Sequence, residues 1–327
     1  AERRSVDDLK GSWQLFIDAR VVAWKPNLLR CRHPFQKDRR SPLIKVDRPW
    51  EENVINATTV IADEDGSGLR MYYYCGTRKG DPQRSYTRYA TGQDGITWEK
   101  PNLGLFEWKG EGPGSGTTNN NIIPNGPTHI MFTPWEKDPH KRYQAVGDMY
   151  HAYSSPDGLR WKRESKETIV SGGDTSHFYW DSHLKRFRGH VKGGANSKVS
   201  SDVLGMSRRV VGFSETDDLT KFPPLRIVMA PDDFDDRWVK PDTVQRTHFY
   251  ACPAAPYETM YIGFLQIYRA EEEWGYFHGP LWLELVSSRD GTRWRRQEGD
   301  REPLLGLGKF RTFDHGMVIA PPPGRPR

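Results

Sequence analysis

The sequence predicts an all-β protein, a five-bladed β-propeller of four-stranded antiparallel blades whose last blade is incomplete. One turn motif recurs along the chain, and pairs of short apolar strands precede its copies. The 31 glycines and 24 prolines among 327 residues favour many short elements over a few long helices. Twelve Trp, 14 Tyr and 14 Phe are too many for a disordered chain. No apolar run approaches the ~18 residues of a membrane helix, which excludes an integral helical membrane protein.

The recurring motif is Ser/Thr-x-x-Asp-Gly-x-x-Trp. It covers 91–98, 154–161 and 287–294, with a degenerate copy at 214–222. Successive aspartates, Asp94, Asp157, Asp217 and Asp290, are separated by 63, 60 and 73 residues. Such even spacing indicates one structural unit repeated along the chain.

The motif has the chemistry of a tight turn. Its aspartate can accept backbone hydrogen bonds, and the following glycine can adopt the left-handed conformation. The tryptophan three residues after the glycine then returns to cover the core. Each copy is therefore predicted to join two strands, and its aspartate is structural rather than catalytic.

A pair of strands precedes each turn motif, or its degenerate copy. The predicted pairs are 59–62 with 69–74, 130–132 with 142–146, 178–180 with 186–190, and 249–251 with 260–264. Each unit of about 65 residues then reads as four short antiparallel strands, which is typical of a propeller blade.

Residues 1–327 are predicted to form a single propeller domain. Four blades are expected at approximately 50–110, 120–170, 172–232 and 243–305, and N-terminal strands at 12–45. A partial fifth blade is expected at 306–327, where the chain has no room for the remaining strands. The chain is accordingly expected to be a fragment of a ring, unless the N-terminal strands complete the last blade.

The charge and the cysteine content exclude few classes of binding partner. The 48 Lys and Arg against 43 Asp and Glu leave a net charge of +5, with both signs interspersed. This is the pattern of a solvated surface, not of a nucleic-acid binder, although attraction to an acidic glycan stays open. The three cysteines, Cys31, Cys75 and Cys252, have no metal-ligand spacing, and one disulfide is an option.

The candidate site follows from propeller geometry, in which the innermost strands begin at one mouth of a central channel. Acids at these starts are Glu51, beside Glu52, in blade 1, Asp174 in blade 3 and Asp314 in blade 5. Glycoside hydrolysis needs one carboxyl to protonate the leaving oxygen and a second as base or nucleophile. We expect Glu51 or Asp314 to be the base or nucleophile and Asp174 to orient it or tune its pKa.

Substrate-binding residues are expected around these acids. They are Trp50, His177, Asp242, Arg246, His248 and Tyr250. Arg246 could hold a carboxylate in its ionised form or bind an acidic substrate. No cofactor is expected, and His177, His183 and His190 do not converge on one face, so no metal site is predicted.

Each acid also has a structural interpretation. Glu51 could cap the turn before its strand, and Asp174 could order the loop after two glycines. Asp314 could pair with Arg311, and Asp242 could be a solvated loop residue.

Several segments resemble the bacterial glycosyl-hydrolase-like proteins of the five-bladed propeller superfamily that includes glycoside hydrolase families 32, 43 and 68. They are 14–18 (QLFID), 48–51 (RPWE), 89–104 (YATGQDGITWEKPNLG), 119–123 (NNNII), 287–291 (SSRDG) and 313–317 (FDHGM). The resemblance implies a channel site with three acids from separate blades, matched here by Glu51, Asp174 and Asp314. It also implies an oligo- or polysaccharide substrate, a monomer, and a secreted or periplasmic location.

The chain departs from that family pattern at two places. Residues 53–58 replace the family-32 nucleophile motif, and Thr247-His248 stand where similar proteins carry an acid. Sucrose or fructan hydrolysis is therefore not expected. Two alternatives stay open: a non-catalytic glycan-binding propeller, and a sialidase-like exoglycosidase, which would need an arginine cluster and a Tyr–Glu pair.

Overall fold

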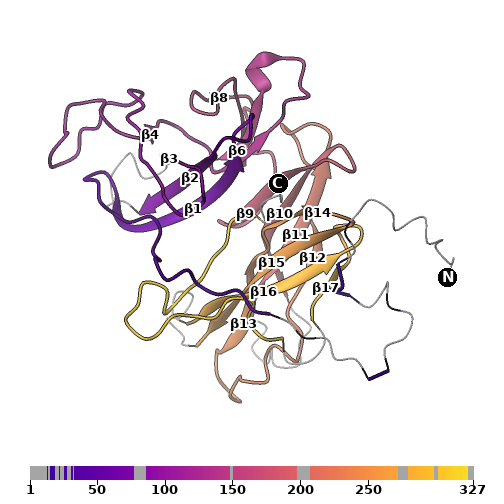
Figure 1. The fold of residues 1–327 in the computed structure, drawn as a ribbon. Helices are drawn as coiled ribbons and strands as arrows, with labels where there is room; N and C mark the ends of the chain where they lie inside the picture. The colour runs from indigo at the N-terminus through magenta and orange to yellow at the C-terminus, as the bar shows by residue number, and fades with distance from the viewer. Residues whose placement is uncertain are drawn as a thin grey trace.

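The computed structural model describes residues 13, 15–18, 22, 26–27, 31, 33–76, 86–147, 150–196, 207–271, 279–297 and 301–322. These residues form four antiparallel sheets arranged as the blades of a propeller (Figure 1). The only described helical element besides isolated turns is the short 3-10 helix η3 (Pro139–Lys141) between two strands of blade 2.

The first two blades are consecutive along the chain and lie side by side in the upper left of Figure 1. Blade 1 has the order β1-β2-β3-β4 and blade 2 the order β5-β6-β7-β8. The strands are β1 (Glu52–Ala62), β2 (Leu69–Gly76), β3 (Thr87–Gly92), β4 (Ile122–Ile123), β5 (His129–Phe132), β6 (Tyr143–Gly147), β7 (His151–Ser155) and β8 (Lys162–Arg163). Blade 1 thus closes with 122–123, beyond the predicted boundary at 110.

The other two blades lie toward the lower right of Figure 1. Blade 3 pairs its strands in sequence order, and in blade 4 a short extra strand, β14, pairs with β15. The strands are β9 (Ser176–Asp181), β10 (Arg186–Asn196), β11 (Ser207–Thr216), β12 (Arg226–Met229), β13 (Arg246–Ala251), β14 (Ala254–Tyr257), β15 (Met260–Ala270), β16 (Leu281–Ser288) and β17 (Trp294–Arg295).

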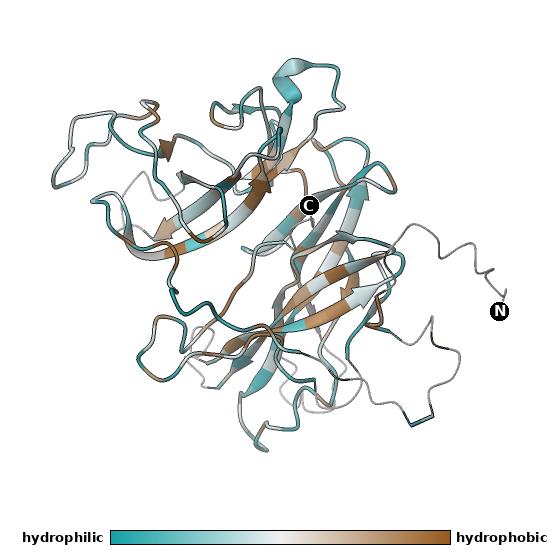
Figure 2. Ribbon diagram, in the orientation of Figure 1, coloured by the Kyte–Doolittle hydropathy of each residue, from teal (hydrophilic) through white to brown (hydrophobic). Residues whose placement is uncertain are grey.

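Apolar side chains between neighbouring blades hold the arrangement together. Tyr72 of blade 1 packs with Tyr143 of blade 2, and Phe178 of blade 3 packs with Val146 of blade 2. Val211 of blade 3 packs in one cluster with residues of blade 4. Figure 2 shows this pattern as hydrophobic strands joined by hydrophilic turns. Removing this apolar surface from water is the main stabilising contribution to the fold.

The Asp-Gly turns form as the sequence predicts. In each of the three complete motifs the aspartate accepts backbone N–H groups two and three residues later, at 2.7–2.8 Å. The glycines that follow, Gly95, Gly158 and Gly291, have φ angles of 73°, 79° and 72°. The three tryptophans pack against core clusters. The aspartates are therefore structural.

The degenerate motif differs from the prediction. Asp217 is exposed and pairs with Arg186 instead of closing the turn. Asp218, one residue later, accepts the backbone N–H of Thr220 at 2.9 Å. Because the glycine is missing, the turn shifts by one residue onto a second aspartate.

The prediction of a partial fifth blade is wrong for the described residues, which form four blades. Residues 301–322 contain no strand and instead pair with β16 through isolated bridges, Leu283 with Leu305 and Leu281 with Met317. The predicted N-terminal strands at 12–45 fall largely outside the described residues, and the described part of that stretch contains no strand. The C-terminal segment therefore extends the edge of blade 4.

Candidate functional site

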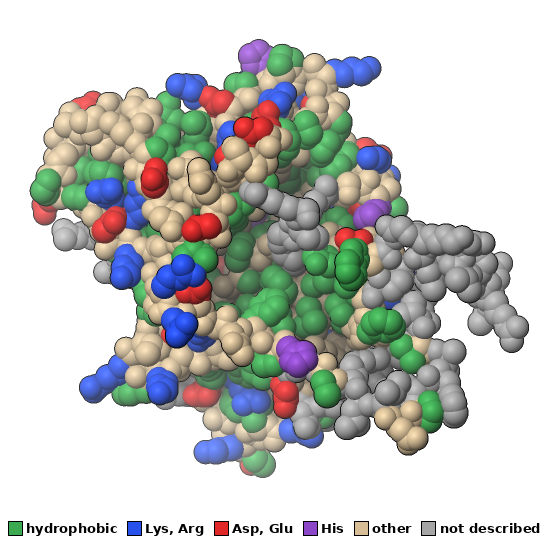
Figure 3. Space-filling view, viewed as in Figure 1, with side chains coloured by type: hydrophobic (Ala, Val, Ile, Leu, Met, Phe, Trp, Pro, Cys, Tyr) green, Lys and Arg blue, Asp and Glu red, His purple; other side chains and the backbone are tan. Residues whose placement is uncertain are grey.

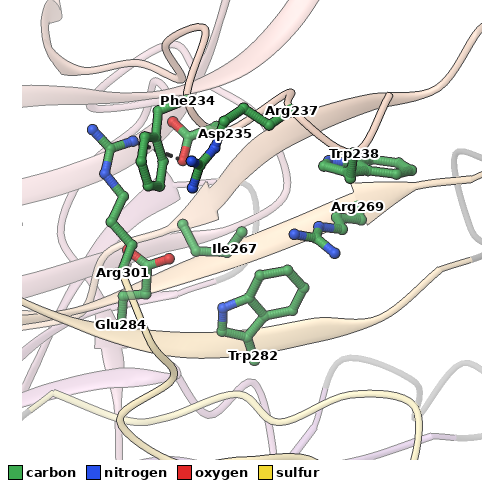
Figure 4. A pocket seen from close by; sticks show the side chains of 9 residues that line it. All are labelled: Phe234, Asp235, Arg237, Trp238, Ile267, Arg269, Trp282, Glu284 and Arg301. Atoms are coloured by element: carbon green, nitrogen blue, oxygen red, sulfur yellow. Dashed lines mark hydrogen bonds and ion pairs between the residues drawn. The ribbon is translucent and has the colours of Figure 1, made fainter. Parts of the chain in front are cut away.

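A cavity of about 310 Å³ opens on blade 4, at the end of the sheet where β13 begins (Figure 4). We call it the blade-4 pocket. Its lining residues are Phe234, Asp235, Arg237, Trp238, Ile267, Arg269, Trp282, Glu284 and Arg301. The cavity combines three aromatic side chains, three arginines and two carboxylates, so it can offer both stacking surfaces and hydrogen-bonding groups.

One wall of the pocket is formed by side chains of the paired strands β15 and β16. Ile267 of β15 lies opposite Trp282 of β16, and Leu265 lies opposite Glu284. Alternate residues of a strand share a face, so Ile267 and Arg269 lie on the same face of the sheet as Trp282 and Glu284.

The second wall is the loop between β12 and β13, which is fixed to the start of β13. The Thr247 hydroxyl donates to the Asp235 carbonyl at 2.8 Å, and the Trp238 indole N–H donates to that hydroxyl at 2.9 Å. Asp236 forms a buried ion pair with Arg208 at 2.6 Å. The loop residues that face the cavity are therefore held in place before any ligand arrives.

Two buried carboxylates in the pocket share one guanidinium. Arg296 donates to both oxygens of Asp235 at 2.7 Å and to Glu284 Oε2 at 2.5 and 3.0 Å. Arg301 binds Asp235 at 3.0 Å and both oxygens of Asp232 at 2.6 and 2.7 Å.

The two lining acids have different electrostatic surroundings. Burial raises the pKa of Glu284, and the nearby Arg296 offsets this only in part. Asp235 instead receives hydrogen bonds from two arginines. Burial therefore favours the protonated form of Glu284.

Arg269 is the central cation of the pocket. Its guanidinium carbon lies 5.1 Å from the Trp238 ring centroid and 4.9 Å from that of Trp282. Figure 4 shows the guanidinium between the two indoles. Arg269 Nε and Trp282 Nε1 are buried, and neither has a hydrogen-bond partner in the described part of the chain. Buried donors without partners are rare, and they indicate a group that a ligand could satisfy.

A second polar cluster lies where β10 and β11 approach β13. Lys192 Nζ lies 4.7 Å from the Tyr250 ring centroid and forms an ion pair with Asp174. The Arg209 guanidinium lies 5.5 Å from the rings of both Tyr250 and Tyr268. Burial, assisted by Arg209, lowers the pKa of Lys192 to about 8. The structure thus brings together two predicted residues, Asp174 and Tyr250, through a lysine that the prediction omitted.

Glu51 lies in a closed network within blade 1. Its side chain is fully buried and accepts hydrogen bonds from Tyr73 Oη at 2.6 Å, Lys100 Nζ at 2.7 Å and the Asp47 N–H at 3.1 Å. Trp50, its neighbour, donates its indole N–H to Asn121 at 2.7 Å. The hydrogen bond from the Asp47 N–H is the contact that the capping interpretation of Glu51 predicts.

The other predicted acids are also paired with lysines. Asp314 binds Lys37, rather than Arg311, and the Thr312 hydroxyl, and the hydrogen bond from Lys37 lowers the pKa of Asp314. Asp174 is exposed and bound to Lys192. No described contact joins Glu51, Asp174 and Asp314 to one another, so the structure does not assemble them through direct interactions.

The remaining predicted binding residues occupy separate environments. His177 is buried edge-on to His129, and burial lowers its pKa. His248 accepts a hydrogen bond from the Arg209 N–H and stacks on Tyr268. Arg246 is buried at the start of β13, whereas Asp242 is exposed in the preceding loop.

Sequence reasoning missed the blade-4 pocket, although two signals were present. Glu284 is the only charged residue in the otherwise apolar strand 281–288. Residues 232–238 combine four aspartates with Phe234 and Trp238 in one short loop. A charge inside an apolar strand and an aromatic–acidic loop both suggest a polar cavity, but only pairing across the fold shows that they meet.

Three further features are defined by the described residues. All three cysteines are free, with Cys75 and Cys252 buried. Within the described ranges, no group of three or more His, Cys, Asp or Glu side chains could hold a metal ion. None of the helices among these residues has the length and apolar character to cross a membrane.

Figure 3 shows Lys and Arg interspersed with Asp and Glu over one face, without a large patch of one sign.

The fold is shared with several solved structures. One comes from a report on the GH130 family of mannoside phosphorylases, which contains glycoside hydrolases that target β-1,2-mannosidic linkages in Candida mannan; it is 12% identical, covers 92% of this chain and 90% of its own, and has a TM-score of 0.53. A protein from Bacteroides thetaiotaomicron, provisionally assigned as a glycosidase, is 10% identical over 88% of each chain with a TM-score of 0.53.

A third similar structure is an N-acetylgalactosamine deacetylase from F. plautii in complex with blood group B trisaccharide. It is 13% identical, covers 80% of this chain and 73% of its own, and has a TM-score of 0.50. No family model and no curated protein matches the sequence. The chain therefore has a glycosidase-like propeller fold.

Proposed function

We propose that this protein is carbohydrate-active and binds a saccharide in the blade-4 pocket. The observation that carries the proposal is the pair Trp238 and Trp282, which lie on either side of Arg269 in a cavity that also contains Asp235 and Glu284. The volume lies at the lower end of the roughly 300–1,000 Å³ of small-molecule sites, which fits a short saccharide.

The chemistry of the lining suits a sugar. A pyranose presents an apolar C–H face, which an indole can cover, and a rim of hydroxyls. Carboxylates accept hydrogen bonds from those hydroxyls, and arginine and the indole N–H donate to their oxygens. The similar folds described as acting on glycans add support for a carbohydrate ligand.

Binding can be tested by calorimetry after a glycan-array screen. We expect Trp282→Ala to weaken binding of the selected glycan at least tenfold, because a stacking surface and a donor are both lost. Trp135→Ala is the matched control, since Trp135 is 46% exposed in the β5–β6 turn and far from the pocket lining in sequence. Equal affinity of Trp282→Ala and the unmodified protein would overturn the proposal.

Hydrolysis of a glycosidic bond is a second candidate activity for the same pocket. It is favoured by the carboxyls of Glu284 and Asp235 bridged by Arg296, with the pKa of Glu284 raised by burial. Glu284 would be the acid and Asp235 the base or nucleophile. The sialidase alternative is supported in part, because the pocket lining contains three arginines and Glu284 but no tyrosine among its described residues.

Substitutions can test whether the catalytic acids are Glu284 and Asp235 or the acids predicted from the sequence. We expect Glu284→Gln to abolish release of reducing sugar, whereas Asp174→Asn and Asp314→Asn retain it, because neither aspartate lines the blade-4 pocket. If hydrolysis were lost only in Asp174→Asn or Asp314→Asn, the active site would instead be assigned to the acids predicted at the mouth of the central channel. A secreted or periplasmic location and a monomeric state stay part of the proposal.

A further inference from the structure

In the blade-4 pocket both carboxylates form ion pairs, whereas two of the three lining arginines form none with a described residue. Both lining carboxylates, Asp235 and Glu284, are engaged by Arg296, and Asp235 is also engaged by Arg301. Arg237 and Arg269 also line the cavity, but no carboxylate of the described chain lies within ion-pair distance of either. Arg237 and Arg269 therefore have no direct ion-pair partner in the described chain, and the carboxylates of Glu271, Asp235 and Glu284 act on Arg269 only from a greater distance.

We infer that the blade-4 pocket selects an anionic saccharide, a glycan that carries a carboxylate or a sulfate ester, with Arg269 as the residue that binds the anion. This inference rests on the proposed function and names the substrate class for the same site.

The surroundings of Arg269 argue for recognition rather than stabilisation. Its guanidinium carbon lies between the two indoles, 5.1 Å from the Trp238 ring centroid and 4.9 Å from that of Trp282 (Figure 4). The buried Nε has no described partner. A guanidinium binds carboxylate or sulfate through two parallel N–H donors, and this interaction strengthens where water is displaced.

Two neighbouring groups can complete an anion site. Trp282 Nε1 is a buried donor without a described partner. Arg237 is exposed at the pocket, with its guanidinium carbon 3.3 Å from the Phe234 ring centroid. An anionic group in the pocket would satisfy the buried donors, and the aromatic walls would cover the sugar ring that carries it.

The test compares three probes by calorimetry on the full chain: a galacturonate oligosaccharide, a sulfated galactose oligosaccharide and a neutral galactose oligosaccharide of the same length. We expect at least one anionic probe to bind tenfold or more tightly than the neutral one. The carboxylated and sulfated arms identify which anion the pocket prefers.

Variants test whether Arg269 is the residue responsible for the preference for an anionic saccharide. Arg269→Gln should remove it, lowering affinity for the anionic probe at least tenfold more than affinity for the neutral probe. Arg269→Lys, which keeps the charge but lacks the planar fork, should recover only part of it. Arg295→Gln is the control, since Arg295 is an exposed arginine on β17 of the same blade. Circular dichroism melts confirm that each variant is folded.

The outcomes separate the two proposals. Equal binding of neutral and anionic probes, or an anionic preference that survives Arg269→Gln, would overturn the inference while leaving saccharide binding intact. If no probe binds and the glycan-array screen is also negative, saccharide binding itself fails.

Discussion

Two buried clusters of acids and cations invite comparison, one around Glu51 in blade 1 and one around Glu284 in blade 4. Glu51 accepts hydrogen bonds from Tyr73, Lys100 and a backbone N–H, and it is not among the residues that line the blade-4 pocket. Glu284 and Asp235 also share a cation, Arg296, yet they line a cavity of about 310 Å³.

Burial and ion pairing therefore do not by themselves identify a functional carboxylate. Charged side chains in a protein interior need partners wherever they occur, because an unpaired buried charge is strongly destabilising. What characterises blade 4 is a cavity beside the acids, which Arg269 and Trp282 also line. The following experiments test this distinction, beginning with the largest expected effect.

Glu51→Ala should lower the free energy of unfolding by up to about 3–5 kcal/mol, because it removes the buried carboxylate of the pair and leaves Lys100 with only Asp47 and the Lys45 carbonyl. Saccharide binding by the molecules that remain folded should be unchanged. Urea denaturation measures the first quantity and calorimetry the second. A stable Glu51→Ala variant that no longer binds glycan would place Glu51 in the functional site and end the contrast between the two clusters.

Tyr73→Phe removes one hydrogen bond to a carboxylate and should cost about 1.5–3 kcal/mol of unfolding free energy. Trp282→Phe removes an N–H that has no described partner in the ligand-free protein, so its stability loss should be smaller. The order should reverse for glycan affinity. A larger stability loss for Trp282→Phe would show that the indole N–H already has a structural role.

Glu284 should make stability depend on pH with a defined sign. Because its pKa is raised in the folded state, its stabilising contribution is complete below the usual value of 4.5 and is lost as pH rises through the folded pKa. The unfolding free energy of the unmodified protein, relative to Glu284→Gln, should therefore fall as the pH rises above the usual glutamate pKa of 4.5. Each unit of pKa difference corresponds to about 1.4 kcal/mol.

Asp314→Asn should give a pH dependence of stability opposite to that of Glu284. It should also give the smallest change in unfolding free energy. The hydrogen bond from Lys37 lowers the pKa of Asp314, so its contribution is present above the usual aspartate range and is lost as pH falls through the folded pKa. Since Lys37 is partly exposed, the loss at pH 7 should be below about 1 kcal/mol. The same urea series measures it, and a loss of several kcal/mol would show that the C-terminal segment is essential to the fold.

The sequence was most informative where structure depends on neighbouring residues. The turns at Gly95, Gly158 and Gly291 form as predicted because an aspartate and a glycine determine the backbone conformation within four residues. The strand pairs that precede them follow from the same short-range pattern. The shifted turn at Asp218 shows the limit, since losing the glycine moved the turn by one residue.

The number of blades and the partners of each acid depended on contacts between distant residues. Residues 313–319 have the composition of a strand, but the isolated bridge of Met317 to Leu281 leaves this stretch as an edge segment of blade 4. Asp314 lies 277 positions from its lysine partner, Lys37. Spacing along the chain carries no information about such a pair.

The amino-acid sequence alone thus determined an all-β chain of repeated four-stranded units with structural Asp-Gly turns, because these depend on local backbone preferences and strand alternation. The tertiary structure alone decided that there are four blades in the described chain, that lysines occupy Glu51, Asp174 and Asp314, and that Glu284 and Asp235 share a pocket with Arg269. The physical reason is that a cavity and its charge balance arise from side chains that converge from separate strands and loops.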